Sequence, residues 1–459
     1  MNNSPFPIRG VVEGFYGAFY TAPERNDLIS FISEYGYNLY VYGPKNDRQH
    51  RARWREPYPD FIMEQFAETV SHSKKLGVEF CYSIGSGVSI NYAAEEDFQY
   101  ITSKWKAFYD IGVRTFMIML DDIKAEFLHD EERKRFKSYG EAHVHLTNRL
   151  YNWLKSIDKM CTLSICPTDY HGKAPFSDYI HELGEGLLSG IDICYTGPEI
   201  CSKTISEQDA ANFAEAIHRK PIIWDNYPVN DLAMTSEMHI GPITGRDASL
   251  PSECKGFIVN TMSQAEASKI SLITYADYFE NPEGYNAWVS WEKALKRVGG
   301  EDNYNALRTF AENSLYCCLG FAEAEKLEAL TSNVLLELHS GESASTSQAM
   351  NKLYNYLDLL DEAGYHLKFR MTNYALRNNL LSWIELMESW AWAGRRAIAV
   401  LKALENKEEV NGLLCWLKDS IGEVEKHPKR FAGSVLLPLI EYTRVKVAKD
   451  FGALVFQNE

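Results

Sequence analysis

Residues 1–285 repeat one unit, a short apolar run followed by a stretch with the period of an amphipathic helix. Short apolar runs that alternate with helices are typical of parallel strands joined by crossover helices. The eight runs with strand character are Arg9–Glu13, Asn38–Tyr42, Glu79–Ile84, Thr115–Leu120, Thr162–Cys166, Asp192–Tyr195, Pro221–Trp224 and Gly256–Val259. Eight such units predict an α/β fold of the (β/α)8 or TIM-barrel type.

The segments between these runs have helical period and helix-starting residues. The predicted helices are Pro23–Tyr35, Asp60–Leu76, Glu95–Asp110, Tyr139–Lys159 and Ser206–Ile217, with a last one near Gln264–Ser271. A doubly wound sheet is the structural alternative. No Gly-x-Gly-x-x-Gly motif follows the first run, which weakens a dinucleotide-binding interpretation of that alternative.

After Asn281–Gly284 the strand pattern stops and the remaining segments have helical period. The predicted helices are Tyr304–Tyr316, Glu323–Leu338, Ser347–Leu367, Tyr374–Leu404, Glu408–Ile421 and Gly433–Phe451. We therefore predict two domains, a catalytic barrel over residues 1–285 and an all-α helical bundle over residues 286–459. Apolar residues at helical spacing in Trp383–Trp392 indicate a core position or a dimer face, and a ligand role for the tryptophans is a less favoured alternative.

The formal net charge of −16 argues against binding to nucleic acid or to an anionic membrane through the overall field. The nine cysteines are odd in number and scattered, which is typical of free thiols in a reducing compartment. Met1–Pro7 lacks the basic and apolar regions of a secretory signal, and no apolar run reaches membrane-spanning length. We expect a cytoplasmic protein with no membrane partner.

The apolar run Thr115–Leu120 ends in two adjacent acids, Asp121 and Asp122. In a barrel, the carboxyl ends of the strands carry the chemistry. Because neighbouring carboxylates repel each other, one can hold a proton while the other stays ionised, as an acid and a base or orienting group. The alternative is a helix N-terminus, where aspartate is common for capping alone. This stretch by itself does not decide between the two.

Polar and aromatic residues follow most of the other predicted strands. They are Glu13–Gly17, Gly43–Asp47, Pro167–Tyr170, Thr196–Glu199, Trp224–Asn226 with Asp231, and Asn260. Carboxylates and amides can hold the hydroxyls of a pyranose, and an aromatic wall can cover the apolar face of its ring. Each residue alone has an ordinary explanation as a cap, a turn or rim packing. Their joint occurrence favours a sugar-binding site.

Other chemistries have little support. His143 and His145 lie two apart on a predicted helix, so they face different ways and cannot share a metal as an i, i+4 pair would. The sequence has no Cys-x-x-Cys zinc pattern and no phosphate loop. We therefore predict a site without metal or cofactor.

The motifs together resemble a known family. They are Arg9–Gly17, Tyr42–Asp47 with His50-Arg51 and Trp54-Arg55, Asp121-Asp122, Cys166–Tyr170, Thr196–Pro198, Trp224–Asn226, Asn230-Asp231 and Asn260. In this order they resemble the catalytic domain of glycoside hydrolase family 84, the β-N-acetylglucosaminidases that include the protein O-GlcNAc hydrolases. The resemblance spans about residues 8–290. Phe19-Tyr20 and Gly43–Asp47 depart from the usual family motifs, so the resemblance says least about the aglycone.

The resemblance implies a retaining, exo-acting enzyme whose substrate supplies its own nucleophile. The 2-acetamido oxygen would attack the anomeric carbon and form an oxazoline, an exception to the usual two-carboxylate scheme. Asp121 would orient and polarise the acetamido N–H. Asp122 would protonate the leaving oxygen and then deprotonate water. The implied partner is a glycan or glycoprotein that bears GlcNAc.

The same resemblance assigns the sugar contacts. Cys166, Tyr170, Thr196 and Trp224 would surround the acetamido methyl, with Asn226 holding that group or the neighbouring aspartate; Gly14 and Lys45 would contact the 3-hydroxyl, and Asp231 and Asn260 the 4- and 6-hydroxyls. Two other functions stay open, an endo-acting glycan hydrolase of the hyaluronidase type and a GlcNAc-binding pseudoenzyme. The C-terminal helices could also form a homodimer.

Overall fold

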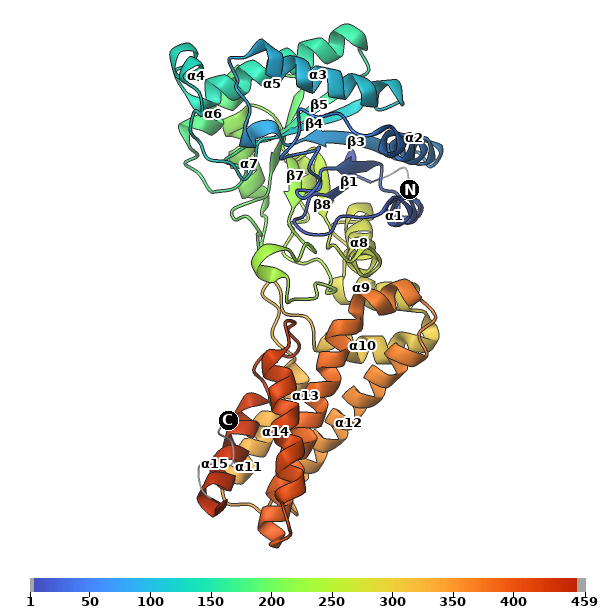
Figure 1. Cartoon of the computed structure of the whole chain (residues 1–459), viewed down its shortest axis with the longest axis vertical. Helices are drawn as coiled ribbons and strands as arrows, with labels where there is room; N and C mark the ends of the chain where they lie inside the picture. Colours follow the sequence, from blue (N-terminus) through green and yellow to red (C-terminus); the bar gives the residue numbers. More distant parts are fainter. Residues whose placement is uncertain (1–3, 452–459) are drawn as a thin grey trace. The chain divides into compact units, whose positions relative to one another are not determined.

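The structure is a computed structural model that describes residues 4–451. Eight parallel strands close into a barrel in chain order, which confirms the predicted fold class (Figure 1). The strands are β1 (Ile8–Glu13), β2 (Leu39–Tyr42), β3 (Glu79–Ile84), β4 (Thr115–Met119), β5 (Thr162–Cys166), β6 (Ile191–Tyr195), β7 (Ile222–Asp225) and β8 (Gly256–Asn260). The barrel closes where Ile8 pairs with Gly256. Every predicted strand is present, with its bounds shifted by at most a residue or so.

Helices follow the strands and cover the outside of the barrel (Figure 1). They are α1 (Ala22–Glu34), α2 (Asp60–Lys75), α3 (Glu95–Asp110), α4 (Asp130–Arg135), α5 (Tyr139–Ile157), α6 (Asp178–Gly186), α7 (Glu207–Ile217) and α8 (Ala265–Glu280), with single turns η1 (Ser86–Val88), η2 (Leu232–Met234) and η3 (Leu250–Ser252). The sequence did not predict α4 or α6, since α4 is wholly charged and α6 is short and contains two glycines. Helix α8 runs past the predicted end at Ser271 because it is buried almost all round.

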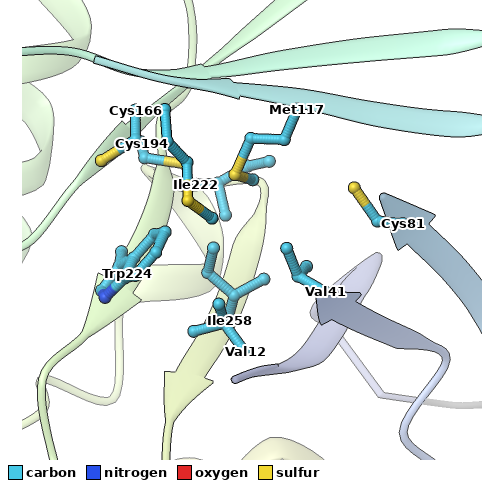
Figure 2. Close-up of a cluster of buried hydrophobic side chains, with 10 residues drawn as sticks. Val12, Val41, Cys81, Met117, Cys166, Cys194, Ile222, Trp224 and Ile258 are labelled. Carbon is cyan, nitrogen blue, oxygen red and sulfur yellow. The ribbon is translucent and has the colours of Figure 1, made fainter. Parts of the chain in front are cut away.

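The inside of the barrel is filled by small, branched and sulfur-bearing side chains. Figure 2 shows this cluster, formed by Val12, Val41, Cys81, Met117, Met119, Cys166, Cys194, Ile222, Trp224 and Ile258. Alternate side chains of a strand point to the same face. A residue two positions after one of these inward residues therefore also faces the inside of the barrel, nearer to its carboxyl end. The register therefore fixes which residues after each strand face the barrel axis.

Two buried ion pairs lie on the outer side of the strands. Arg25 of α1 donates from Nε to Glu13 Oε2 at 2.8 Å and from Nη2 to Glu13 Oε1 at 3.1 Å. Arg246 donates to both oxygens of Asp225, at 2.7 Å and 2.5 Å. All four side chains are buried, so each pair is a fully enclosed charge contact between a strand and its surroundings.

The chain divides into two compact units. One contains the residues up to Leu232 with Pro242–Ser290, and the other contains Ala233–Gly241 with the residues from Trp291 onward. The helices of the C-terminal region are α9 (Ala287–Gly299), α10 (Tyr304–Glu312), α11 (Glu325–His339), α12 (Gln348–Phe369), α13 (Tyr374–Asn406), α14 (Asn411–Lys426) and α15 (Leu437–Phe451), with the turn η4 (Glu301–Asn303). In residues 4–451 no helix has both the length and the apolar character that a membrane crossing requires.

Two tryptophans of α13 belong to the core of the second unit. Trp383 and Trp390 are buried, which agrees with the core alternative predicted for this segment. The indole N–H of Trp383 donates to the carbonyl oxygen of Ser236 at 2.8 Å. Trp291 likewise donates to the carbonyl oxygen of Ile240 at 2.6 Å. These two bonds attach Ala233–Gly241 to the helices, a long-range connection that sequence period does not reveal.

Candidate active site

The residues predicted from strand ends meet at the carboxyl end of the barrel. Gly14, Asp121, Thr196, Asn226 and Asn260 each lie two residues after an inward position of a strand, at Val12, Met119, Cys194, Trp224 and Ile258. Because side chains alternate along a strand, this register turns all five toward the barrel axis. Direct hydrogen bonds then join most of the predicted site residues into three groups, around Asp121, Asp122 and Asn226.

Asp121 is buried, with 6% of its surface exposed. One of its oxygens, Oδ2, accepts a short hydrogen bond from Lys45 Nζ, which lies after β2. The other, Oδ1, is buried and has no hydrogen-bond partner in the described part of the chain. A buried carboxylate oxygen without a donor is costly, so its place is suited to a donor that arrives with a ligand. Lys45 Nζ also lies 5.9 Å from the centre of the Trp224 ring.

Asp122 leaves the strand register and turns outward. Its φ of +54° lies in the left-handed region, which non-glycine residues adopt only when their surroundings hold them there. The turn separates the two acids, because Asp121 is buried in the barrel mouth while Asp122 is exposed at its rim. Arg51 Nη2 donates to the backbone carbonyl oxygen of Asp122 at 3.0 Å and so supports this turn.

Two tyrosines hold the carboxylate of Asp122. Tyr16 donates its hydroxyl to Oδ2 and Tyr170 donates to Oδ1, both at 2.9 Å. Burial raises the pKa of both phenols, and the negative charge of Asp122 raises each of them further. Both hydroxyls therefore stay protonated at neutral pH and remain donors. The two contacts fix the position of the more exposed acid.

Trp224 forms one wall of the site. Its indole N–H donates to Asn226 Oδ1 at 2.8 Å, and Asn260 Nδ2 donates to the same oxygen at 2.9 Å. Asn260 Oδ1 in turn accepts from the backbone N–H of Gly14 at 3.2 Å. A Cβ on Gly14 would lie 2.6 Å from Trp224 Cζ2, so only glycine lets the backbone approach the ring this closely. Trp224 is therefore held by its hydrogen bond to Asn226 and by close packing against the backbone of Gly14.

Three predicted site residues remain, namely Asp231, Cys166 and Thr196. Asp231 Oδ2 accepts from the backbone N–H of Tyr16 at 2.7 Å, and burial raises the pKa of its carboxyl. The Cys166 thiol is fully buried, which raises its pKa well above the usual range and keeps it protonated. Thr196 donates its backbone N–H to the carbonyl oxygen of Tyr170 at 2.8 Å and its hydroxyl to that of Glu199 at 2.9 Å. Every predicted site residue thus lies in this region.

Sequence reasoning missed two residues that contact Asp122, namely Tyr16 and Arg51. Both lie inside motifs that the sequence made conspicuous, after β1 and after β2 respectively. Tyr16 occurs two residues after Gly14, so the alternating register could have indicated it. Arg51 lies in an irregular loop and contacts a backbone oxygen, which no side-chain pattern signals.

His143 has a structural environment. Its Nδ1 lies 2.9 Å from the hydroxyl of Tyr179 and its Nε2 lies 2.9 Å from that of Tyr92. Burial lowers the pKa of His143 to about 3, so the ring is neutral at physiological pH. No group of three or more His, Cys, Asp or Glu side chains that could hold a metal ion occurs between residues 4 and 451.

A closed barrel with an acidic pair, an aromatic wall and amide side chains at its carboxyl end is the arrangement of a carbohydrate-processing barrel protein. Comparison with known proteins agrees with this class. The family profile described as beta-N-acetylglucosaminidase matches residues 9–312. The chain belongs to this family of glycoside hydrolases, and the predicted resemblance to glycoside hydrolase family 84 is confirmed.

Individual relatives extend the comparison. Over 277 residues the chain is 31% identical to protein O-GlcNAcase of Rattus norvegicus and, equally, to that of Mus musculus. The matched stretch is 59% of this chain but only 30% of each of these relatives, so it spans under a third of their length. A solved mutant of Thermobaculum terrenum O-GlcNAc hydrolase superimposes with a TM-score of 0.88 at 27% identity, covering 98% of this chain and 97% of that one.

Proposed function

We propose that this protein is a retaining exo-β-N-acetylglucosaminidase that removes terminal β-linked GlcNAc, including O-GlcNAc on protein Ser or Thr, by substrate-assisted catalysis. The observation that carries the proposal is the asymmetry of Asp121, whose Oδ2 is paired with Lys45 while the buried Oδ1 has no donor. An acetamido N–H supplies the missing donor. The resemblance and the family support the same assignment.

The first step forms the oxazoline. The acetamido N–H donates to Asp121 Oδ1, which polarises the amide so that its carbonyl oxygen attacks the anomeric carbon. The bond from that carbon to the aglycone oxygen breaks, and Asp122 transfers its proton to the departing oxygen. The positive charge that develops on the cyclised amide lies against ionised Asp121, which stabilises it in a site with little water.

The second step reverses these roles. Asp122, now ionised, removes a proton from water while the water oxygen attacks the anomeric carbon and the oxazoline C–O bond breaks. The acetamido group is restored and GlcNAc leaves with its β configuration retained. Tyr16 and Tyr170 keep Asp122 in place through both steps, since each donates to one of its oxygens.

Lys45 serves two groups in this proposal. An ammonium has three donors, so Lys45 can keep its contact with Asp121 and also reach the 3-hydroxyl of the sugar. The contacts of Asp231 and Asn260 with the 4- and 6-hydroxyls stay predictions. Cys166, Tyr170, Thr196 and Trp224 form the proposed methyl pocket.

The direct test is hydrolysis of 4-nitrophenyl β-GlcNAc by the wild type and by Asp122→Asn, with a thiazoline analogue of GlcNAc as inhibitor. We expect turnover that the analogue blocks. We expect the variant to lose about 10²–10⁴-fold in kcat/KM on alkyl glycosides, whose leaving groups need a proton, and far less on the aryl glycoside. Tight binding of the analogue without turnover would indicate a GlcNAc-binding pseudoenzyme, and cleavage of polymeric glycan alone would indicate an endo-acting hydrolase.

We further propose that the C-terminal helices form a homodimer. Tyr365 and Phe369 of α12 are exposed and their rings lie 4.9 Å apart, with Tyr374 exposed at the start of α13. Exposed aromatic groups of this kind mark interaction surfaces. Light scattering should give a dimer mass for the wild type and a lower mass for Phe369→Glu. A monomer mass for the wild type would contradict the proposal. The cytoplasmic location stays a prediction.

A further inference from the structure

A pocket of about 220 Å³ opens beside Asp122, between the segments that follow β3 and β4. Val88, Ile90 and Tyr92 line it from the first segment, and Asp122, Ile123 and Leu128 from the second. A cavity of about 150 Å³ can hold a benzene molecule, so a pocket of this volume is large enough for one apolar side chain. None of the predicted sugar contacts takes part in it.

The rim of the pocket carries apolar side chains that face solvent, beside the charged side chains of Lys124 and Glu126. Val88 is 38% exposed and Leu128 is 50% exposed. Gly87 permits the close packing below the rim, because a Cβ there would lie 2.5 Å from Ile123 Cδ1. A concave surface that is mostly apolar with a few polar groups at its edge is typical of a ligand site, and here the charged groups are Asp122, Lys124 and Glu126.

Hydrogen bonds hold the part of the pocket wall that contains Tyr92 and Tyr139. The Tyr92 hydroxyl lies 2.9 Å from His143 Nε2 and 3.3 Å from the hydroxyl of Tyr139, which also lines the pocket. His143 is fully enclosed and is anchored on its other side by Tyr179. A wall fixed by such a network loses little freedom when a ligand binds, which favours binding.

The position of the pocket identifies its occupant, provided that the proposed function holds. The departing oxygen must lie within hydrogen-bond reach of Asp122, so the aglycone begins at that carboxyl and continues along the surface beside it. The pocket shares Asp122 as part of its wall. We propose that it is an aglycone subsite that binds an apolar side chain of the polypeptide carrying the GlcNAc.

The test uses a set of peptides that carry one GlcNAc-Ser in a Gly/Ser background. Leu, Ala or Glu is placed in turn at each of the three positions on either side of the modified serine. We expect one position at which Leu gives a kcat/KM about tenfold above Ala, because filling an apolar pocket discriminates by roughly this factor. Glu at that position should be no better than Ala.

Variants locate the effect. In Val88→Ser/Leu128→Ser the ratio of kcat/KM between the Leu and Ala peptides should fall toward one. The matched control is Phe61→Ser, since Phe61 is an apolar residue 61% exposed on α2, and its ratio should stay as in the wild type. Rates on 4-nitrophenyl β-GlcNAc are measured for each protein to correct for changes in the amount of active enzyme.

Failure of this inference is distinct from failure of the proposed function. Equal rates for the Leu, Ala and Glu peptides, or a preference that survives in the double variant, would overturn the subsite while leaving the hydrolase intact. Turnover of the aryl glycoside with no peptide cleaved would also overturn it. Loss of all turnover, including that of the aryl glycoside, would instead refute the proposed function on which the subsite depends.

Discussion

The outer layer of the barrel and the barrel mouth each contain a buried carboxylate, and the two carboxylates differ in their hydrogen-bond donors. Outside the strands, Asp225 is 1% exposed and each of its oxygens accepts from Arg246. At the mouth, Asp121 is 6% exposed, yet only Oδ2 has a donor and Oδ1 has none in the described residues. The two acids are similar in burial and differ in pairing.

This difference separates a structural acid from a binding acid. A buried charge is costly unless it is paired and hydrogen-bonded, so a fully paired carboxylate can serve the fold alone. A buried carboxylate with one oxygen that lacks a donor can still accept a hydrogen bond from a ligand. Asp225 and Asp121 have the same charge and similar burial. They differ in how many of their carboxylate oxygens accept a hydrogen bond from a protein group.

Between these two acids, the largest expected effect is on activity, from Asp121→Asn. We expect kcat/KM to fall about 10²–10³-fold for good and poor leaving groups alike, because the group that stabilises developing positive charge is lost in every reaction. Steady-state kinetics on aryl and alkyl β-GlcNAc substrates measures this. A loss confined to poor leaving groups would assign Asp121 the role of the acid instead.

The same substitution in the outer layer should affect stability. Asp225→Asn leaves Arg246 buried without its charged partner, and breaking a buried pair costs about 3–5 kcal/mol. Urea denaturation should show this loss, while kcat of the folded fraction stays near that of the wild type. Asp121→Asn also leaves a buried cation, Lys45, without its charged partner, so activity and not stability distinguishes the two acids. A loss of kcat in Asp225→Asn as large as that in Asp121→Asn would contradict the proposed difference.

A smaller effect is expected from Tyr16→Phe, which removes one of the two hydroxyls on Asp122. Tyr170 still holds the other oxygen, so we expect about a tenfold loss in kcat, within the range of one hydrogen bond to a charged group. Steady-state kinetics measures this loss, and an unchanged kcat with a raised KM would place Tyr16 in substrate binding.

The smallest effect concerns Asp231, whose carboxyl pKa is raised by burial. With the pKa in the folded state above that in the unfolded state, this group favours the fold most at low pH, and the contribution is lost as the pH rises through the folded-state pKa. Asp231→Asn should therefore gain about a few tenths of a kcal/mol at pH 7 and less at pH 4. Thermal melts across that range measure the difference, and a gain independent of pH would contradict the cause.

Much of this architecture could be predicted from the sequence because strand and helix periods are local. The eight strands were placed within a residue or so, and Asp121 and Asp122 were found where β4 ends. Helix α4 was missed because its six charged residues have no apolar period. The contact of Lys45 with Asp121 joins loops 76 residues apart, and no local pattern carries such information.

The same limit applies to the backbone. Because the backbone of Asp122 is left-handed, Asp121 and Asp122 face different environments. The identity of the residue as aspartate does not predict this conformation. The attachment of Ala233–Gly241 to the second unit likewise depends on tryptophans far along the chain, such as Trp383. The sequence motifs predicted which residues belong to the site, whereas the fold shows which of them hydrogen-bond to each other.

The central claim is that the acetamido group of the substrate is the nucleophile and that Asp121 assists it. The most direct measurement is kcat/KM for 4-nitrophenyl glycosides whose N-acetyl group carries zero, one, two or three fluorines. Each fluorine withdraws electrons from the acyl oxygen, so we predict a steady fall of about tenfold per fluorine, or ~1.4 kcal/mol of barrier each. Equal rates across the series would contradict the account, because the nucleophile would then belong to the enzyme or be water.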